Sequence, residues 1–127
     1  MPTAWSDNIV IAELLDEPAL SDELSALIQR AEGEKPKDAP RDQGRAQGPM
    51  PHVVLNFGAV TYMNSSNLGQ LLRLRKLLAE AGRQLRLCSI NDDVWQILMV
   101  TGLDKVFRFA PDPLTALAGL QMDGAEH

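Results

Sequence analysis

Two adjacent serines, Ser65 and Ser66, lie between Asn64 and Asn67 at the point where a predicted strand passes into a predicted helix. A serine at a helix start can accept a hydrogen bond from a backbone N–H, and as an N-cap it stabilises the helix by about 1 kcal/mol. The same hydroxyl can be phosphorylated, which adds a charge of about −1.5 to −2 where the helix dipole and free N–H groups favour an anion. The two roles are compatible, and phosphorylation here should leave the fold intact.

Other residue types give little support to catalysis, redox chemistry or metal binding. The single cysteine, Cys88, cannot form an internal disulfide and lies in a predicted strand, which favours a small buried thiol. Two histidines and one cysteine do not make a metal site of the usual spacing, and His52 is expected to be structural. Asp92 and Asp93 are interpreted as cap residues, and no GxxxxGK[ST] phosphate loop is present. We expect a protein that is not an enzyme and that needs no cofactor or metal.

Composition limits the classes of partner. A chain of 127 residues with 45% hydrophobic residues is long enough for one domain with a packed core. The net charge of −5 argues against a general nucleic-acid binder, which would carry a basic face. Because neither a membrane span nor a secretory signal is evident, we expect a cytoplasmic protein whose partner is another protein.

Strands and helices alternate along the chain and must position the two serines. The near-continuous apolar run at residues 52–57 predicts a central strand that is covered on both faces. Further strands are predicted at residues 8–14, 84–90 and 106–109, and helices at residues 21–32, 66–81, 94–101 and 111–120. Ser21 is the expected N-cap of the first helix, and Gly82 closes the second. This order predicts an α/β fold with a mixed, mostly parallel sheet and helices packed on it.

Residues 33–51 interrupt this pattern with many prolines, glycines and charges. Because the apolar pattern resumes directly afterwards, we interpret the segment as a flexible surface insertion in a single domain that spans residues 1–127. Trp95 is expected in the core. Trp5 either packs across the sheet or docks a second subunit, so a homodimer remains an open alternative.

Residues 53–107 resemble the STAS domain of bacterial anti-sigma factor antagonists. The segment MNSSNLG at residues 63–69 is similar to that family's turn, hydrophobic-Asp-Ser-Ser/Thr-Gly-Leu-Gly, and TGL at residues 101–103, followed by Val106 and Phe107, is similar to its Thr/Ser-Gly-Leu ending. The earlier residues 8–28 fit the family more loosely. The resemblance therefore implies a STAS-like fold.

The resemblance also implies a function. In such antagonists the serine after the Asp position is phosphorylated by a partner that is both anti-sigma factor and serine kinase. The unmodified antagonist binds that partner and frees the sigma factor for transcription, and a phosphatase resets the switch. Carried over to this chain, the phosphoacceptor is Ser65, with Ser66 as the alternative. The implied partner-binding residues are those of the turn and the next helix: Met63, Asn64, Ser65, Ser66, Asn67, Gln70 and Arg73.

This sequence departs from the family pattern at the two asparagines that flank the serines. Asn64 replaces the family's Asp, which lowers the electrostatic opposition to a phosphate on Ser65 but removes a carboxylate that a kinase could require. Asn67 replaces a glycine and adds a side chain that could obstruct a partner. These departures favour an alternative function, in which the chain is an unphosphorylated STAS scaffold subunit of a lipid-transport ABC complex or of a sensory assembly.

Overall fold

The computed structural model describes residues 3–6, 9–33 and 51–125. The elements in chain order are β1 (Thr3–Ser6), β2 (Ile9–Leu15), α1 (Ala19–Gly33), β3 (His52–Ala59), α3 (Ser65–Glu80), β4 (Leu85–Cys88), α4 (Asp92–Thr101), the 3-10 helix η2 (Leu103–Lys105), β5 (Arg108–Ala110) and α5 (Pro113–Ala125). The predicted insertion lies almost wholly outside the described residues, as does the side chain of Trp5.

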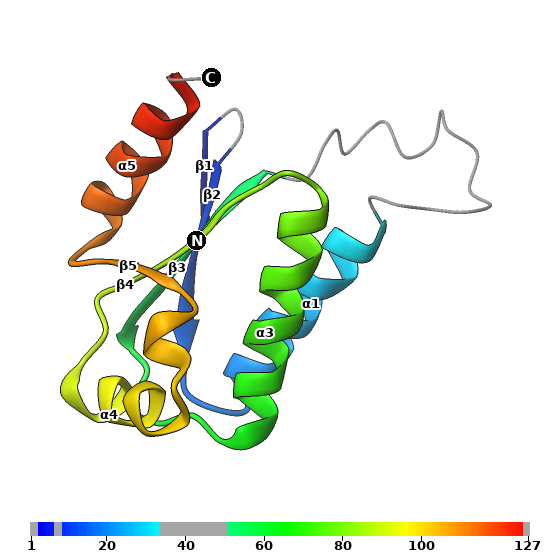
Figure 1. Cartoon of the computed structure of the whole chain (residues 1–127). Coiled ribbons are helices and arrows are strands. Elements are labelled where there is room, and N and C mark those ends of the chain that lie inside the picture. The colour runs from blue at the N-terminus through cyan, green and yellow to red at the C-terminus, as the bar shows by residue number, and fades with distance from the viewer. Residues whose placement is uncertain (1–2, 7–8, 34–50, 126–127) are drawn as a thin grey trace.

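The sheet has five strands in the order β1-β2-β3-β4-β5. Strands β2 to β5 pair in parallel with their neighbours, and β1 pairs antiparallel with β2. Helices α1 and α3 lie on one side of this sheet and α5 on the other (Figure 1). The predicted α/β fold is confirmed, and the short edge strand β1 is an addition to it.

Both faces of the sheet are buried against helices. On the larger side, Val53, Leu55 and Phe57 of β3 join one core cluster with apolar residues of α1, α3 and α4. On the other side, Val54 packs in a smaller cluster with Ala116 and Leu120 of α5. Burial on both faces explains why β3 is an almost unbroken apolar run.

The helix ends differ from the predicted ends by a few residues. α1 begins at Ala19, so Ser21 lies inside its first turn, where the Glu17 carboxylate accepts a hydrogen bond from the Ser21 N–H. α3 ends before Gly82, whose φ of 76° is the left-handed conformation that glycine tolerates best. Gly102, with φ 80°, ends α4 in the same way.

Three single-residue predictions concern packing. The Cys88 side chain is fully buried, and this burial raises the pKa of its thiol. His52 is buried, and its Nδ1 accepts a hydrogen bond from the Gln84 N–H at 3.0 Å, as expected of a structural residue. Trp95 is only partly buried and packs edge-to-face on Phe109, with ring centroids 5.1 Å apart.

Two findings bear on the expected classes of site. In the part of the chain that the structure describes, no helix combines the length and the apolar character needed to cross a bilayer. Within the same residues, no three His, Cys, Asp or Glu side chains are grouped so that they could hold a metal ion.

Candidate functional site

Ser65 and Ser66 lie at the carboxyl edge of the parallel strands, the edge at which open α/β sheets usually place their sites. β3 delivers the chain to this edge, and residues 60–64, here called the β3–α3 turn, connect it to α3. The connections that follow β2 and β4 reach the same edge because these strands run parallel to β3.

The cap of α3 is Asn64 and not a serine. The Asn64 backbone is extended, its Oδ1 accepts a hydrogen bond from the Asn67 N–H at 2.8 Å, and the Asn67 Oδ1 accepts one from the Asn64 N–H at 3.0 Å. This reciprocal pair is a capping box built from two asparagines. The interpretation of Ser65 or Ser66 as the cap is therefore wrong: they are the first two helical residues, and both are exposed.

Asn67 also ties the start of α3 to the start of α1. Its Nδ2 donates to Oε2 of Glu17 at 2.8 Å, and the same carboxylate accepts hydrogen bonds from the Ser21 hydroxyl and N–H. The Ser21 hydroxyl, followed by the Asn67 amide and the Ser21 N–H, holds the pKa of Glu17 below its usual value. The Asn67 side chain is completely buried in this structure, so it is used within the chain and does not project from the surface.

Further hydrogen bonds fix the β3–α3 turn from both sides. The Asp16 carboxylate, after β2, accepts from the Thr61 N–H at 2.7 Å and from its hydroxyl at 2.8 Å, and these bonds lower the pKa of Asp16. From the β4 side, Asn91 Nδ2 donates to the Val60 carbonyl at 2.6 Å. The three connections therefore form one hydrogen-bonded unit around the two serines.

Three other predicted partner residues, Met63, Gln70 and Arg73, have side chains that contact the rest of this chain. Met63 is 2% exposed and supports the turn from inside, so its side chain is not available to a partner. Gln70 donates from Nε2 to the carbonyl of Ser21 and the hydroxyl of Ser25, and Arg73 donates to the Glu32 carboxylate. The side chains of Gln70 and Arg73 thus serve the contact between α3 and α1.

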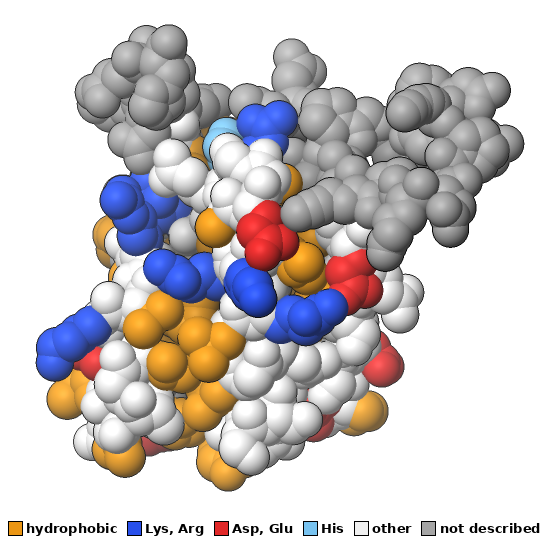
Figure 2. Space-filling view, turned by 45° about the vertical axis from the view of Figure 1, so that its right-hand side comes forward, with side chains coloured by type: hydrophobic (Ala, Val, Ile, Leu, Met, Phe, Trp, Pro, Cys, Tyr) orange, Lys and Arg blue, Asp and Glu red, His pale blue; other side chains and the backbone are white. Residues whose placement is uncertain are grey.

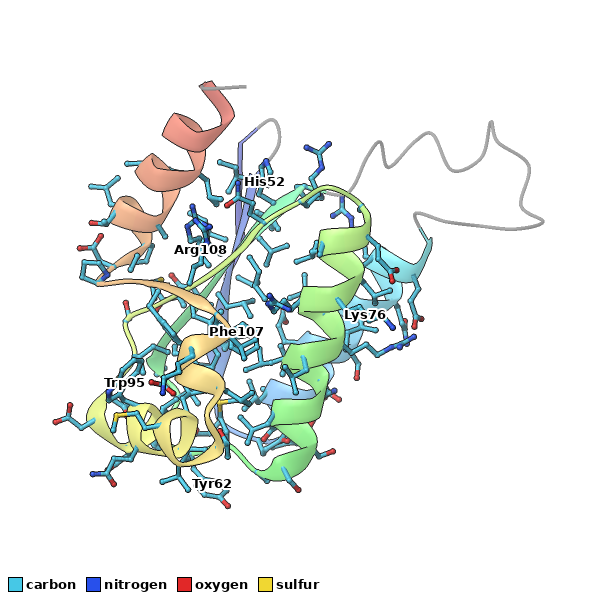
Figure 3. All side chains as sticks on the ribbon, viewed as in Figure 1. His52, Tyr62, Lys76, Trp95, Phe107 and Arg108 are labelled. Carbon is cyan, nitrogen blue, oxygen red and sulfur yellow. The ribbon has the colours of Figure 1, made fainter. Side chains whose placement is uncertain are left out.

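Several exposed apolar side chains were missed in the sequence. Tyr62 in the turn is 62% exposed, and Met99 and Val100 of α4 are 50% and 86% exposed. Tyr62 lies at the same end of the molecule as α4 (Figure 3). An aromatic side chain in a short turn between a strand and a helix is the signal that could have identified Tyr62, because exposed apolar groups mark contact surfaces.

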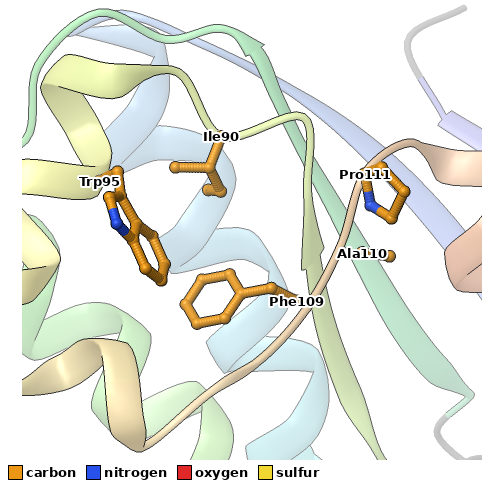
Figure 4. A pocket seen from close by; sticks show the side chains of 5 residues that line it. All are labelled: Ile90, Trp95, Phe109, Ala110 and Pro111. Carbon is orange, nitrogen blue, oxygen red and sulfur yellow. The ribbon is translucent and has the colours of Figure 1, made fainter.

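An open apolar pocket of about 320 Å³ lies near α4, lined by Ile90, Trp95, Phe109, Ala110 and Pro111 (Figure 4). None of these five side chains is titratable or nucleophilic. The pocket therefore offers shape and apolar contact but no group for acid–base or covalent chemistry.

Comparisons with known proteins agree with this architecture. The family model for the STAS domain matches residues 15–116. An anti-sigma F factor antagonist of Paenibacillus polymyxa is 31% identical over 71 residues, a match that spans 56% of this chain and 61% of that protein. The chain thus covers less than two thirds of this relative.

Solved structures show the same fold at low sequence identity. An anti-sigma-factor antagonist (STAS) domain protein from Planctomyces limnophilus has a TM-score of 0.70 and 17% identity, over 94% of this chain and 96% of that one. The STAS domain of a SulP transporter from Vibrio cholerae has a TM-score of 0.68 and 12% identity, over 96% and 88%. The family match also supports the expectation of a regulatory rather than a catalytic domain. The chain belongs to the STAS domain family and is related in sequence to anti-sigma factor antagonists.

Proposed function

We propose that this chain is a cytoplasmic switch of the anti-sigma factor antagonist type. In the unmodified form it binds a protein that is both anti-sigma factor and serine kinase, and so it promotes transcription. Phosphorylation of Ser65 releases that partner, and a phosphatase restores binding. The sequence relative named as an anti-sigma F factor antagonist supports this assignment.

One observation carries the proposal: the exposed serine and the helix cap are different residues. Asn64 and Asn67 satisfy the cap, so the Ser65 hydroxyl has no structural task in the capping box. A kinase could modify Ser65 without removing a bond that holds the helix start. The switch would then act on the surface and not on the fold.

The helix dipole at the start of α3 favours an added phosphate. The first turn of this helix carries no acidic side chain of its own, although Asn67 holds the Glu17 carboxylate of the β2–α1 connection at the helix start. A phosphoserine would supply about −1.5 to −2 charges at this position. The hydrated anion would also make this surface costly to bury against a partner.

Helical geometry favours Ser65 over Ser66. Ser66 shares a helix face with Gln70 and Arg73, four and seven residues later, and these side chains contact α1. Ser65 lies about 100° around the helix from Ser66, on the side that turns away from α1. A phosphate on Ser65 would therefore meet a partner and not α1.

The experiment is to recover the tagged chain from its own cells and locate any phosphate by mass spectrometry, in the wild type and in the Ser65→Ala and Ser66→Ala variants. We expect phosphate on Ser65, and loss of the modified form only in Ser65→Ala. The partner that copurifies should contain a kinase-type ATPase fold. It should be lost in Ser65→Asp but retained in the neutral control Ser65→Asn.

A phosphate that persists in Ser65→Ala and vanishes in Ser66→Ala would move the site to Ser66. An unphosphorylated chain, together with a complex that tolerates Ser65→Asp, would contradict the switch. The transporter and assembly scaffold function would then be favoured, because transporter STAS domains share this fold.

A further inference from the structure

The two long sides of α3 are used differently. The side facing α1 is occupied, because Gln70 and Arg73 bond to α1. Away from α1, four residues recur at helical spacing, and all four are exposed. We call this set the α3 stripe: Ser65, Gly69, Leu72 and Lys76.

The middle of the α3 stripe is apolar and continues onto the next element. Leu72 is 40% exposed, a large fraction for a leucine in a helix that packs on a sheet. Leu68, Leu103 and Val106 are partly buried and pack against the core. Arg75 Nε donates to the Val106 carbonyl at 3.1 Å, which places α3 directly beside the segment that follows η2.

The border of this apolar strip is basic, although the whole chain has a net charge of −5. Arg75 and Lys76 on α3 and Lys105 in η2 are exposed. Among the described residues, neither Lys76 nor Lys105 takes part in an ion pair. Figure 2 shows a row of Lys and Arg side chains across one face of the molecule, with Asp or Glu side chains beside part of the row and a cluster of hydrophobic side chains below it.

Gly69 is the third feature of the stripe. A Cβ placed on Gly69 would have no atom within 4 Å outside its own helix, and the residue has no positive φ that would require glycine. Glycine in a helix interior is less stable than alanine, so the fold gains nothing from it here. A partner backbone that approaches α3 closely would explain its presence.

We propose that the α3 stripe, with Val106 and Lys105, is the docking surface for an acidic amphipathic segment of the protein partner. The proposal rests on the switch described above and gives the chemistry of the partner. Apolar side chains of that segment would cover Leu72 and Val106, and its carboxylates would face Arg75, Lys76 and Lys105.

An acidic partner also explains the direction of the switch. Ser65 and Leu72 are seven residues apart on one face, which is about 10 Å along the helix axis. That distance exceeds the Debye length of about 8 Å at physiological ionic strength, so a phosphate on Ser65 would repel carboxylates docked at Leu72 only weakly and would act mainly on carboxylates docked closer to Ser65. Phosphorylation would therefore weaken the complex without moving any element.

The test uses a synthetic helical peptide with the repeat Leu-Glu-Glu-Leu-Leu-Glu-Glu and the isotope-labelled full chain. Amide chemical shifts should move along the α3 stripe and at Lys105. The double variant Lys76→Glu, Lys105→Glu should weaken peptide binding about tenfold, and Ser65→Asp about threefold. The matched control is Arg108→Glu, because Arg108 is exposed but lies toward α5 (Figure 3), and it should change binding less than twofold.

Two further arms make the result decisive. Gly69→Ala should raise the melting temperature yet weaken peptide binding. A higher melting temperature together with a higher affinity for the peptide would overturn the role of Gly69 as a close-contact residue. A peptide with Lys in place of Glu, and vesicles of anionic phospholipid, should not bind. Equal binding of the basic peptide, vesicle binding that is lost in the double variant, or shifts confined to other surfaces would each overturn the acidic-partner proposal.

The two proposals fail separately. If the peptide binds the α3 stripe but Ser65→Asp leaves its affinity unchanged, the phosphoserine switch fails and the docking surface stands. If Ser65 carries phosphate in cells but the acidic peptide does not shift the stripe, the docking surface fails and the switch stands.

Discussion

The helices α3 and α4 begin in closely similar ways, yet they differ in their first two helical residues. Both start after an extended asparagine cap, Asn64 with φ −99° and Asn91 with φ −86°. In both, the cap Oδ1 accepts from the backbone N–H three residues later, that of Asn67 or Val94. The backbone geometry of the two starts is therefore nearly the same.

The first two helical residues separate them. In α4 these are Asp92 and Asp93, two acidic side chains at the positive end of the helix dipole. In α3 they are Ser65 and Ser66, which are neutral. The comparison teaches that α3 has the backbone geometry of a charged helix start without a carboxylate in its own first turn, and that the proposed phosphate on Ser65 would add a charge there.

The largest expected effect concerns Asn67, which has an apolar counterpart, Val94, in α4. Asn67→Ala removes hydrogen bonds to the Asn64 N–H and the Glu17 carboxylate at a fully buried position, so it should lower the free energy of unfolding by about 2–3 kcal/mol. Asn67→Gly, which restores the family's residue, should lose about 0.5–1 kcal/mol more. Urea unfolding measures both, with exposed Ser66→Ala as the control.

If Asn67→Gly were as stable as the wild type, the buried network would contribute nothing to the helix start. The family's glycine and this asparagine would then be interchangeable, and the contrast between α3 and α4 would lose its structural basis.

The two caps themselves should differ in strength. Asn91→Ala removes the cap of α4 and the bond from its Nδ2 to the Val60 carbonyl, so we expect a loss of about 2 kcal/mol. Asn64→Ala removes one cap bond, and the expected loss is about 1 kcal/mol. Thermal unfolding of both variants tests this order, and a larger loss in Asn64→Ala would contradict it.

Exchanging the charges at the two helix starts should have a smaller effect. Ser65→Asp should stabilise the fold by about 0.3–1 kcal/mol, and Asp92→Ser should destabilise it by a similar amount, because each changes the charge at a helix N-terminus. Both effects should shrink in high salt. Destabilisation by Ser65→Asp would mean that a phosphate is not tolerated at this position.

The fold was predictable from the sequence because its signals are local. The apolar run at residues 52–57 marks the central strand, and glycines at positions 82 and 102 mark helix ends. β1 escaped prediction because residues 3–6 form a short edge strand with little apolar pattern. Its antiparallel pairing with β2 is a contact between two strands, and the composition of residues 3–6 alone does not predict it.

The site was predictable only in part. Four consecutive residues, Asn64 to Asn67, can all cap a helix, so the sequence alone does not decide which of them does. The burial of Asn67 depends on Glu17, which is 50 residues away along the chain. Which side of α3 stays open likewise depends on where α1 and η2 pack. The sequence pattern of α3 alone does not predict those positions.

The smallest expected effect is a change in the pH at which a carboxyl group titrates. It arises because the two helix starts obtain their acidic side chains from different parts of the chain. α4 carries carboxylates in its own first turn, whereas α3 receives Glu17 from the β2–α1 connection through Asn67. The pKa of Glu17 is lowered mainly by the Ser21 hydroxyl, and that of Asp16 mainly by the Thr61 N–H and then by its hydroxyl.

A carboxyl whose pKa is lower in the folded state binds its proton more weakly there than in the unfolded chain. Its stabilisation is complete above the unfolded pKa of about 4, and it is lost as the pH falls through the folded pKa. Thr61→Val removes one of the donors to Asp16, so the Asp16 carboxyl should titrate at a higher pH in this variant while that of Glu17 stays unchanged. Carbon-detected NMR titration measures both, and Ser21→Ala provides the reciprocal control. If Asp16 titrated at the same pH in the wild type and in Thr61→Val, the Thr61 hydroxyl would not hold this carboxylate, and the β3–α3 turn would depend on its backbone bonds alone.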